Sequence, residues 1–221
     1  MLSLFKISKK SFILSVYFLV AFLFTSVTFT NVKADTKLFN EAKYHVETMM
    51  EDIQFLLEVG KTDADQGRIL LTKLLDKYFD SLQIAKFSSM PAWRKATTLE
   101  KEEFITLFEK YLVNLAAKRF DEFKDVEYII SKIEKRGNKM LRVDGHIKAP
   151  GNKRDNTQVA WRLFLNEENK MRIIDIEIAK ISMIVAQNDE FTSIIRNNKG
   201  KFSSLIDVLR KELYINTYLL P

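Results

Sequence analysis

The sequence predicts an α+β protein in which helices at both ends of the chain cover one face of a curved, four-stranded antiparallel sheet. Before residue 124 and after residue 182, apolar residues recur at spacings of three and four, which is typical of amphipathic helices. Between these regions apolar and polar residues alternate in four segments separated by short turns. Short turns favour antiparallel neighbours, and one-sided alternation indicates a sheet with one apolar face.

Two helices are predicted at the start of this domain. The first runs from Thr36 to Val59, and Gly60 is expected to end it in the left-handed conformation. The second is capped by Thr62 or Asp63 and extends to about residue 79, because both residue types accept hydrogen bonds from free backbone N–H groups.

A capping box begins the most strongly periodic helix of the chain. Thr97 and Glu100 stand three residues apart, so each side chain can accept a hydrogen bond from a backbone N–H near the other residue. This helix is expected to reach Phe123, after a short helix or turn at residues 80–87 and a break at residues 88–91.

Four strands are predicted at residues 126–135, 139–148, 157–166 and 170–178, followed by helices at residues 184–196 and 202–214. Three strands have a clean apolar face, formed by Leu141, Val143, Ile147, Val159, Trp161, Leu163, Leu165, Ile174, Ile176 and Ile178. Charged residues occupy the other face, namely Arg142, Asp144, Arg162, Asp175 and Glu177. We interpret them as a solvated face of salt bridges.

Residues 1–34 have the pattern of a secretory signal peptide. Lysines precede an apolar tract at Phe12–Phe24, and small residues occupy the −3 and −1 positions of Val32-Lys33-Ala34. Cleavage after Ala34 leaves residues 35–221 as one exported domain. The alternative is an uncleaved anchor, since residues 11–30 are about long enough to span a bilayer.

Charge and cysteine content exclude several classes of function. The whole chain has 35 basic and 29 acidic residues, but four lysines lie in the leader, so residues 35–221 carry 31 against 29. This balance argues against nucleic-acid binding. Without cysteine, disulfides, thiolate catalysis and cysteine-based zinc sites are excluded.

No residue pattern supports catalysis, a metal or a cofactor. Glu41 and His45 lie one helical turn apart, but two ligands without a third are more typical of a solvated pair. His146 and its neighbour Asp144 fall on the polar strand face, where cross-strand contacts are expected. Nucleophile elbows, phosphate loops and zinc-protease motifs are absent from the sequence.

A collinear set of residues resembles the MlaC family, also called Ttg2 or toluene-tolerance proteins. The set consists of Phe79-Asp80, Ile84-Ala85, Trp93-Arg94, Ala96-Thr97, Glu100, Phe104, Phe108, Tyr111-Leu112, Trp161-Arg162, Ile174-Asp175-Ile176, Ile181-Ser182-Met183, Gln187-Asn188, Phe191, Gly200 and Leu205. The chain departs from the family where Ala179-Lys180-Ile181-Ser182 replaces a Gly-Val-Ser often preceded by Glu, and where Thr98 and Met171 replace a proline and an aromatic residue.

This resemblance implies a monomeric periplasmic phospholipid carrier with an NTF2-like sheet and helices enclosing an apolar cavity. Such carriers move lipid between an outer-membrane lipoprotein complex and an inner-membrane ABC transporter with an MCE-domain ring, and so maintain the lipid asymmetry of the outer membrane. We expect the cavity to be lined by Phe104, Phe108, Tyr111, Leu112, Val143, Ile147, Trp161, Leu163, Leu165, Ile174, Ile176, Ile178, Ile181 and Met183.

Three other functions remain compatible with the residues. A carrier for a hopanoid or sterol-like lipid would need a wider and shorter cavity. An exported NTF2-like enzyme would use Asp144, His146, Asp175 or Glu177 inside the curved sheet, with strongly shifted pKa values. A pure interaction module would have a filled core and no cavity.

Overall fold

The computed structural model describes residues 29–119, 123–149, 151 and 155–218. Most of the expected leader, residues 1–28, lies outside this part. The chain divides into two compact units, residues 1–41 and residues 42–221. The described part of the first unit is the beginning of helix α2 (Phe29–Thr62), where Lys37 and Glu41 form an ion pair at 3.7 Å. Of the helices in the described residues, none is long and apolar enough for a membrane span.

The helices of the larger unit follow the predicted order. After α2 they are α3 (Ala64–Tyr78), α4 (Ser81–Ser88), η1 (Ala92–Lys95), α5 (Thr98–Arg119), α6 (Met183–Asn197) and α7 (Ser203–Tyr218). Asp63 is the N-cap of α3 and accepts a hydrogen bond from Gln66 N at 2.9 Å. The capping box is confirmed: Thr97 N donates to Glu100 Oε2 at 2.8 Å, and Glu100 N donates to Thr97 Oγ1 at 3.2 Å.

The predicted left-handed stop at Gly60 is wrong, because α2 continues through this residue to Thr62. Gly60 instead lies against Gly67 of α3. A Cβ atom on Gly67 would stand 3.0 Å from Gly60 Cα, so these glycines let the two helix backbones approach closely. The sequence shows that residue 60 is a glycine, but its structural role becomes clear only from its contact with Gly67, seven residues later.

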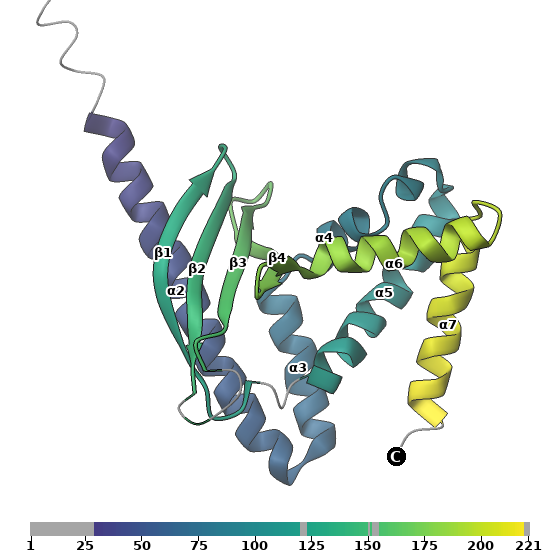
Figure 1. Ribbon diagram of the computed structural model, residues 1–221, viewed down its shortest axis with the longest axis horizontal. Helices are drawn as coiled ribbons and strands as arrows, with labels where there is room; N and C mark the ends of the chain where they lie inside the picture. The colour runs from purple at the N-terminus through teal and green to yellow at the C-terminus, as the bar shows by residue number, and fades with distance from the viewer. Residues whose placement is uncertain (1–28, 120–122, 150, 152–154, 219–221) are drawn as a thin grey trace, which may run out of the picture. The chain divides into compact units, whose positions relative to one another are not determined.

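The predicted antiparallel sheet is confirmed, with one short strand added. Its order is β1 (Glu127–Arg136), β2 (Met140–Lys148), β3 (Gln158–Leu165), β4 (Met171–Ile178) and β5 (Ile181–Ser182). All neighbours are antiparallel. Ala179 and Lys180 form the β4–β5 turn with φ values of 48° and 69°. Figure 1 shows the sheet curving, with α4 and α6 close to β4 and with α5 and α7 beyond them.

Strand register gives the sheet one apolar and one charged face. Val143 on β2 lies opposite Trp161 on β3, which lies opposite Ile176 on β4. The pairing slips after Arg162, so that Leu163 faces Ile173. The predicted alternation is therefore wrong at one position of β4. Ile173, and not the predicted Ile174, lies beside Leu163 in the row of apolar side chains. An extra residue in β4 of this kind is a β-bulge, which shifts the side-chain pattern by one.

The larger unit has two buried regions. One lies on the apolar sheet face and contains Leu141, Val143, Trp161, Leu163 and Ile173. The other lies among the helices and contains Ile84, Ala85, Trp93, Ala96, Phe104, Phe108, Phe191, Ile195, Phe202, Leu205, Ile206 and Leu209. Phe79 packs on this helical core, and its ring contacts Trp161 edge-on at 6.5 Å. The backbone joins the regions at the same place, since Asp80 N donates to Ile173 O at 2.9 Å.

Candidate functional site

A hollow of about 660 Å³ opens between α3, α5 and α7. Its apolar wall is formed by Leu75, Leu107, Leu112, Val113 and Leu213. Its polar residues are Arg68, Thr72, Asp76, Ser81, Glu109, Lys110, Asn114, Arg210 and Tyr214. Ligand pockets for small molecules commonly span about 300–1,000 Å³ and combine apolar walls with a few polar groups. The α3–α5–α7 hollow has both properties.

A second hollow, of about 260 Å³, lies between α2, α3 and α5. Leu56, Leu57 and Leu71 provide apolar wall, and Gly60 and Gly67 also contribute. Arg68 of α3 lines both hollows, and its Nη1 donates to Asn114 Oδ1 of α5 at 3.0 Å. This hydrogen bond therefore links α3 and α5 at the place where the two hollows approach each other.

The second half of α5 is incompletely packed on every side. Each residue from Tyr111 to Ala116 is half-buried, whereas Phe104 and Phe108 earlier in the helix are fully covered. The Tyr111 hydroxyl donates to Gln187 Oε1 of α6 at 3.2 Å. Burial raises the pKa of Tyr111, so the phenol is neutral near pH 7. In this half of α5, Tyr111 and Leu112 pack on the edge of the helical core but stay half-buried, and Leu112 and Val113 also line the hollow.

The helical residues of the predicted lining fall into two environments. Phe104 and Phe108 belong to the helical core, where their rings lie 6.0 and 6.2 Å from the ring of Phe191. Tyr111 packs on the edge of that core, 6.3 Å from the same ring. Leu112 lies in the wall of the α3–α5–α7 hollow.

The sheet residues of the predicted lining share one apolar face, apart from Ile174 beside the bulge. Val143, Ile147, Trp161, Leu163 and Ile174 are buried, while Leu165, Ile176 and Ile178 are half-buried. At the entry to α6, Met183 is half-buried and Ile181 is 59% exposed. Most of the predicted lining residues on the sheet therefore lie together, covered by other side chains. None of them is among the residues that line the α3–α5–α7 hollow.

The charged face of the sheet is a network of ion pairs, as predicted. Arg142 contacts Asp144 and Glu177, and Arg162 contacts Asp175 and Glu177. The network is less solvated than expected, since Asp175 is 5% exposed. Asp175 also accepts hydrogen bonds from Ser182 Oγ at 2.6 Å and from Ile184 N at 3.0 Å, so it fixes the start of α6.

This network does not resemble an acid/base pair. Hydrogen bonding from Arg142 lowers the pKa of Glu177 to about 2, so the carboxylate is ionised and paired at neutral pH. A hollow of about 650 Å³ lies on this face, and Arg142, Asp144, His146 and Glu177 are among its lining residues. A general acid or base that acts near pH 7 would need a pKa near that value.

The two histidines lie in different surroundings, and the buried His45 Nε2 has no hydrogen-bond partner among the described residues. The His45 ring packs edge-on against Tyr78 at 5.1 Å, and burial lowers its pKa. His146 Nδ1 lies 3.5 Å from Ser131 Oγ across the strand pair. Among the described residues there is no cluster of three or more histidine or acidic side chains suited to a metal ion.

Several residues of the α3–α5–α7 hollow were not predicted from the sequence. Arg68, Leu75 and Leu213 come from helices that are far apart in the chain, and only their packing brings them together. The prediction that this helix is the most strongly periodic of the chain is wrong, because α5 is the least amphipathic of the described helices. In its second half the apolar residues spread around most of the helix, apart from the side that carries Lys110, Asn114 and Lys118, and this spread is a sequence signal for the hollow.

The fold and the hollow define an α+β protein with a curved antiparallel sheet and an open hollow bounded by helices. Residues 45–211 match the family described as MlaC protein, and the chain belongs to this family. The resemblance in the residue motifs is thereby confirmed. The comparison with curated proteins finds no match.

A solved structure supports the same fold. The chain is similar to a phospholipid-binding protein from Ralstonia solanacearum, whose structure was determined in complex with a phospholipid. The TM-score is 0.64 at 13% sequence identity, and the alignment covers 79% of this chain and 96% of the other. At this level of identity the similarity establishes the shared architecture.

Proposed function

We propose that this protein is a periplasmic carrier that binds the acyl chains of a phospholipid and moves the lipid between the outer and inner membranes. The observation that carries the proposal is a hollow of about 660 Å³ with an apolar wall, in a chain that belongs to the MlaC family. The related fold from Ralstonia solanacearum, described as phospholipid-binding, adds support.

The energetics of lipid transfer explain why a cavity is sufficient for this function. Two long acyl chains contain roughly 30 methylenes, and each costs about 0.8 kcal/mol to expose to water. Unassisted transfer through an aqueous compartment therefore faces a barrier on the order of 20 kcal/mol. A carrier removes this barrier by apolar burial, and it needs no catalytic group.

We place the acyl chains between α3, α5 and α7, with Leu107, Leu112 and Leu213 as first contacts. The acyl chains reach the predicted lining residues of the sheet only when the side chains that cover Val143, Trp161 and Leu163 move aside. The headgroup remains near Arg68 and the other polar residues of the hollow.

The proposal includes export and two docking partners. Cleavage after Ala34 releases residues 35–221 into the periplasm, where the protein exchanges lipid with an outer-membrane lipoprotein complex and an inner-membrane ABC transporter carrying an MCE-domain ring. The carrier acts as a monomer.

Native mass spectrometry of the purified protein, followed by lipid extraction, tests the proposal. We expect a copurifying species with the mass of a phospholipid and near-stoichiometric occupancy. A hopanoid in the extract would show that the protein carries a polycyclic lipid and not a phospholipid. A folded protein without lipid, which also takes up none from vesicles, would overturn the proposal.

Variants in the wall locate the ligand. Leu112→Glu and Leu213→Glu place a charge in the hollow at half-buried positions, and we expect each folded variant to lose most of the copurifying lipid. Leu82→Glu is the matched control, because Leu82 is exposed on α4 and is not among the residues that line the hollow. Lipid retained at wild-type occupancy in both wall variants would contradict the assigned position.

A further inference from the structure

One end of the helical region is strongly basic. Residues 91–101 and 192–202 contain six basic residues and a single acid, Glu100. The six are Arg94, Lys95, Lys101, Arg196, Lys199 and Lys201, which we call the basic end. The remainder of residues 35–221 then carries 25 basic against 28 acidic residues. The acids next to the two segments are Glu102 and Glu103 on α5 and Asp189 and Glu190 on α6, of which Glu103 pairs with Arg210.

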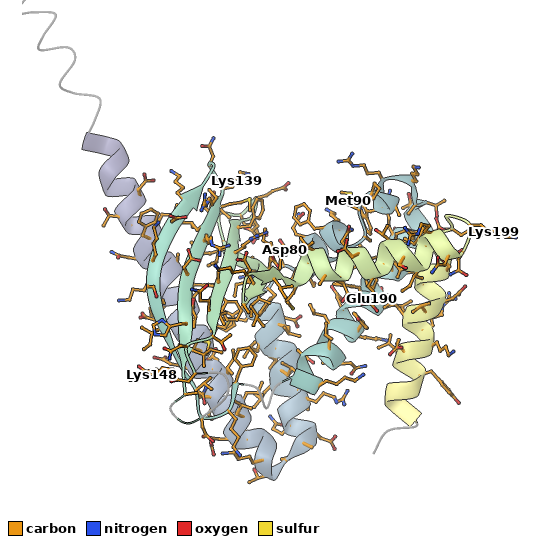
Figure 2. The ribbon with its side chains drawn as sticks, in the orientation of Figure 1. Asp80, Met90, Lys139, Lys148, Glu190 and Lys199 are labelled. Carbon is orange, nitrogen blue, oxygen red and sulfur yellow. The ribbon has the colours of Figure 1, made fainter. Side chains whose placement is uncertain are left out.

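Packing brings these residues together from three elements. A hollow of about 510 Å³ is lined by Lys95 of η1, Glu100 of α5 and Arg196 of α6. The rings of Trp93 and Phe202 meet at 6.4 Å beneath the surface, which fixes η1 against the α6–α7 turn. Figure 2 shows Lys199 at that turn, pointing away from the helices.

The charge of the basic end is not neutralised within the described residues. None of the six side chains forms an ion pair with a described carboxylate, and Lys101 Nζ lies over the Trp93 ring at 5.7 Å. Glu100 is committed to the capping box, where it accepts hydrogen bonds from Thr97 N and Thr97 Oγ1. This concentration of unpaired cations attracts an extended anionic partner.

We propose that the basic end is a docking surface for an anionic membrane, with phosphatidylglycerol or a similar lipid as its recognised component. Clustered lysines and arginines next to an anionic bilayer gain affinity with each added charge. Leu99 stands among them, 78% exposed, and is suited to enter the headgroup region.

A membrane fits this surface better than an acidic protein does. Protein interfaces have a desolvated core in which aromatic residues are enriched and lysine is depleted. At the basic end the aromatic residues Trp93 and Phe202 are buried, and Leu99 is the large apolar side chain that is exposed. Four of the six cations are lysines, which suit a diffuse and hydrated contact.

Vesicle flotation with the purified protein tests this inference, which does not require a bound cargo. We expect binding to phosphatidylcholine vesicles that contain phosphatidylglycerol, no binding to pure phosphatidylcholine, and release at high salt. The triple variant Lys95→Glu/Lys199→Glu/Lys201→Glu should bind at least about tenfold more weakly. Leu99→Ser should weaken binding a few-fold.

A matched variant separates the basic end from net charge. Lys73→Glu/Lys139→Glu/Lys211→Glu reverses three exposed lysines elsewhere and gives the same net charge. We expect it to retain most of the vesicle binding. Equal loss in both triple variants, or a wild-type protein that floats with neither vesicle at low salt, would overturn the inference. A wild-type protein that binds an acidic protein but no anionic vesicle would do so as well.

The readout also distinguishes this inference from the proposed carrier function. Lipid occupancy by mass spectrometry reports on the hollow, and flotation reports on the basic end. Lost vesicle binding with normal lipid occupancy in the basic-end variant supports the docking surface without bearing on the cargo.

Discussion

Arg142 on β2 and Glu177 on β4 form a two-pronged ion pair across the intervening strand β3. Arg142 Nη1 donates to Glu177 Oε2 at 2.8 Å, and Nη2 donates to Oε1 at 2.9 Å. Ala160 of β3 lies in register between Asp144 and Glu177, and its small side chain leaves the path of the arginine open. The ion pair thus ties together three strands of the sheet.

Removing one partner of this pair should destabilise the fold. We expect Glu177→Gln and Arg142→Met each to lower the free energy of unfolding by about 1–3 kcal/mol, because the remaining half-buried group loses its charged partner. The double variant should lose less than the sum of the single losses. Urea unfolding followed by circular dichroism measures all three values. Additive losses would mean that the two groups do not interact.

The same pair predicts how stability depends on pH. Hydrogen bonding from Arg142 lowers the pKa of Glu177 from 4.5 to about 2. A carboxylate whose pKa is lower in the folded protein than in the unfolded chain stabilises the fold. This stabilisation is complete when the pH is above the pKa of the unfolded chain, and it is lost as the pH falls towards the pKa of the folded protein. We expect stability to decline between pH 4.5 and 2, with a shallower decline in Glu177→Gln. Identical slopes for the two proteins would contradict this assignment.

Gly60 and Gly67 should respond in opposite directions to alanine. Gly67→Ala places a Cβ 3.0 Å from the Gly60 backbone, so overpacking should outweigh better helix propensity and cost about 1–2 kcal/mol. In Gly60→Ala the nearest atom is 3.9 Å away, an ordinary contact, and the variant should gain up to about 1 kcal/mol. Thermal unfolding of both proteins checks the prediction, and a stabilised Gly67→Ala would refute it.

The β4–β5 turn should be improved by glycine. Ala179 and Lys180 both have positive φ values, 48° and 69°, which glycine adopts without steric cost. Lys180→Gly should stabilise the protein by about 0.5–1 kcal/mol in urea unfolding. Lys148→Gly is the control, since glycine within strand β2 should destabilise. A loss of stability in Lys180→Gly would show that the turn is not strained.

The elements that the sequence predicted correctly depend on local signals. The Thr97–Glu100 capping box lies within four residues, and the alternation along β2 and β3 lies within each strand. The exact row of apolar residues on β4 was not accessible, because the bulge before Asp175 is set by pairing with β3. The role of Asn188 also depends on contacts that are distant in sequence. The sequence places Asn188 in a family motif, but only the fold shows that its side-chain amide donates a hydrogen bond to Met90 O at 2.5 Å.

The candidate site was predictable only in part for the same reason. Leu112 follows from the family motif and lies in the α3–α5–α7 hollow. Arg68 and Leu213 are remote in sequence, and no local pattern marks α3 and α7 as two sides of the same hollow. Whether the sheet residues receive the acyl chains stays a prediction, and loss of copurifying lipid from a folded Ile176→Asp variant, at a half-buried sheet position, would support it.

The two buried regions meet where the rings of Phe79 and Trp161 lie edge-on, with centroids 6.5 Å apart. Backbone and side-chain hydrogen bonds anchor the helices to β4 at the same place, from Asp80 N to Ile173 O and from Ser182 Oγ and Ile184 N to Asp175. Strand β4 is therefore a shared support, and a change in its bulge would disturb the helical core and the sheet together.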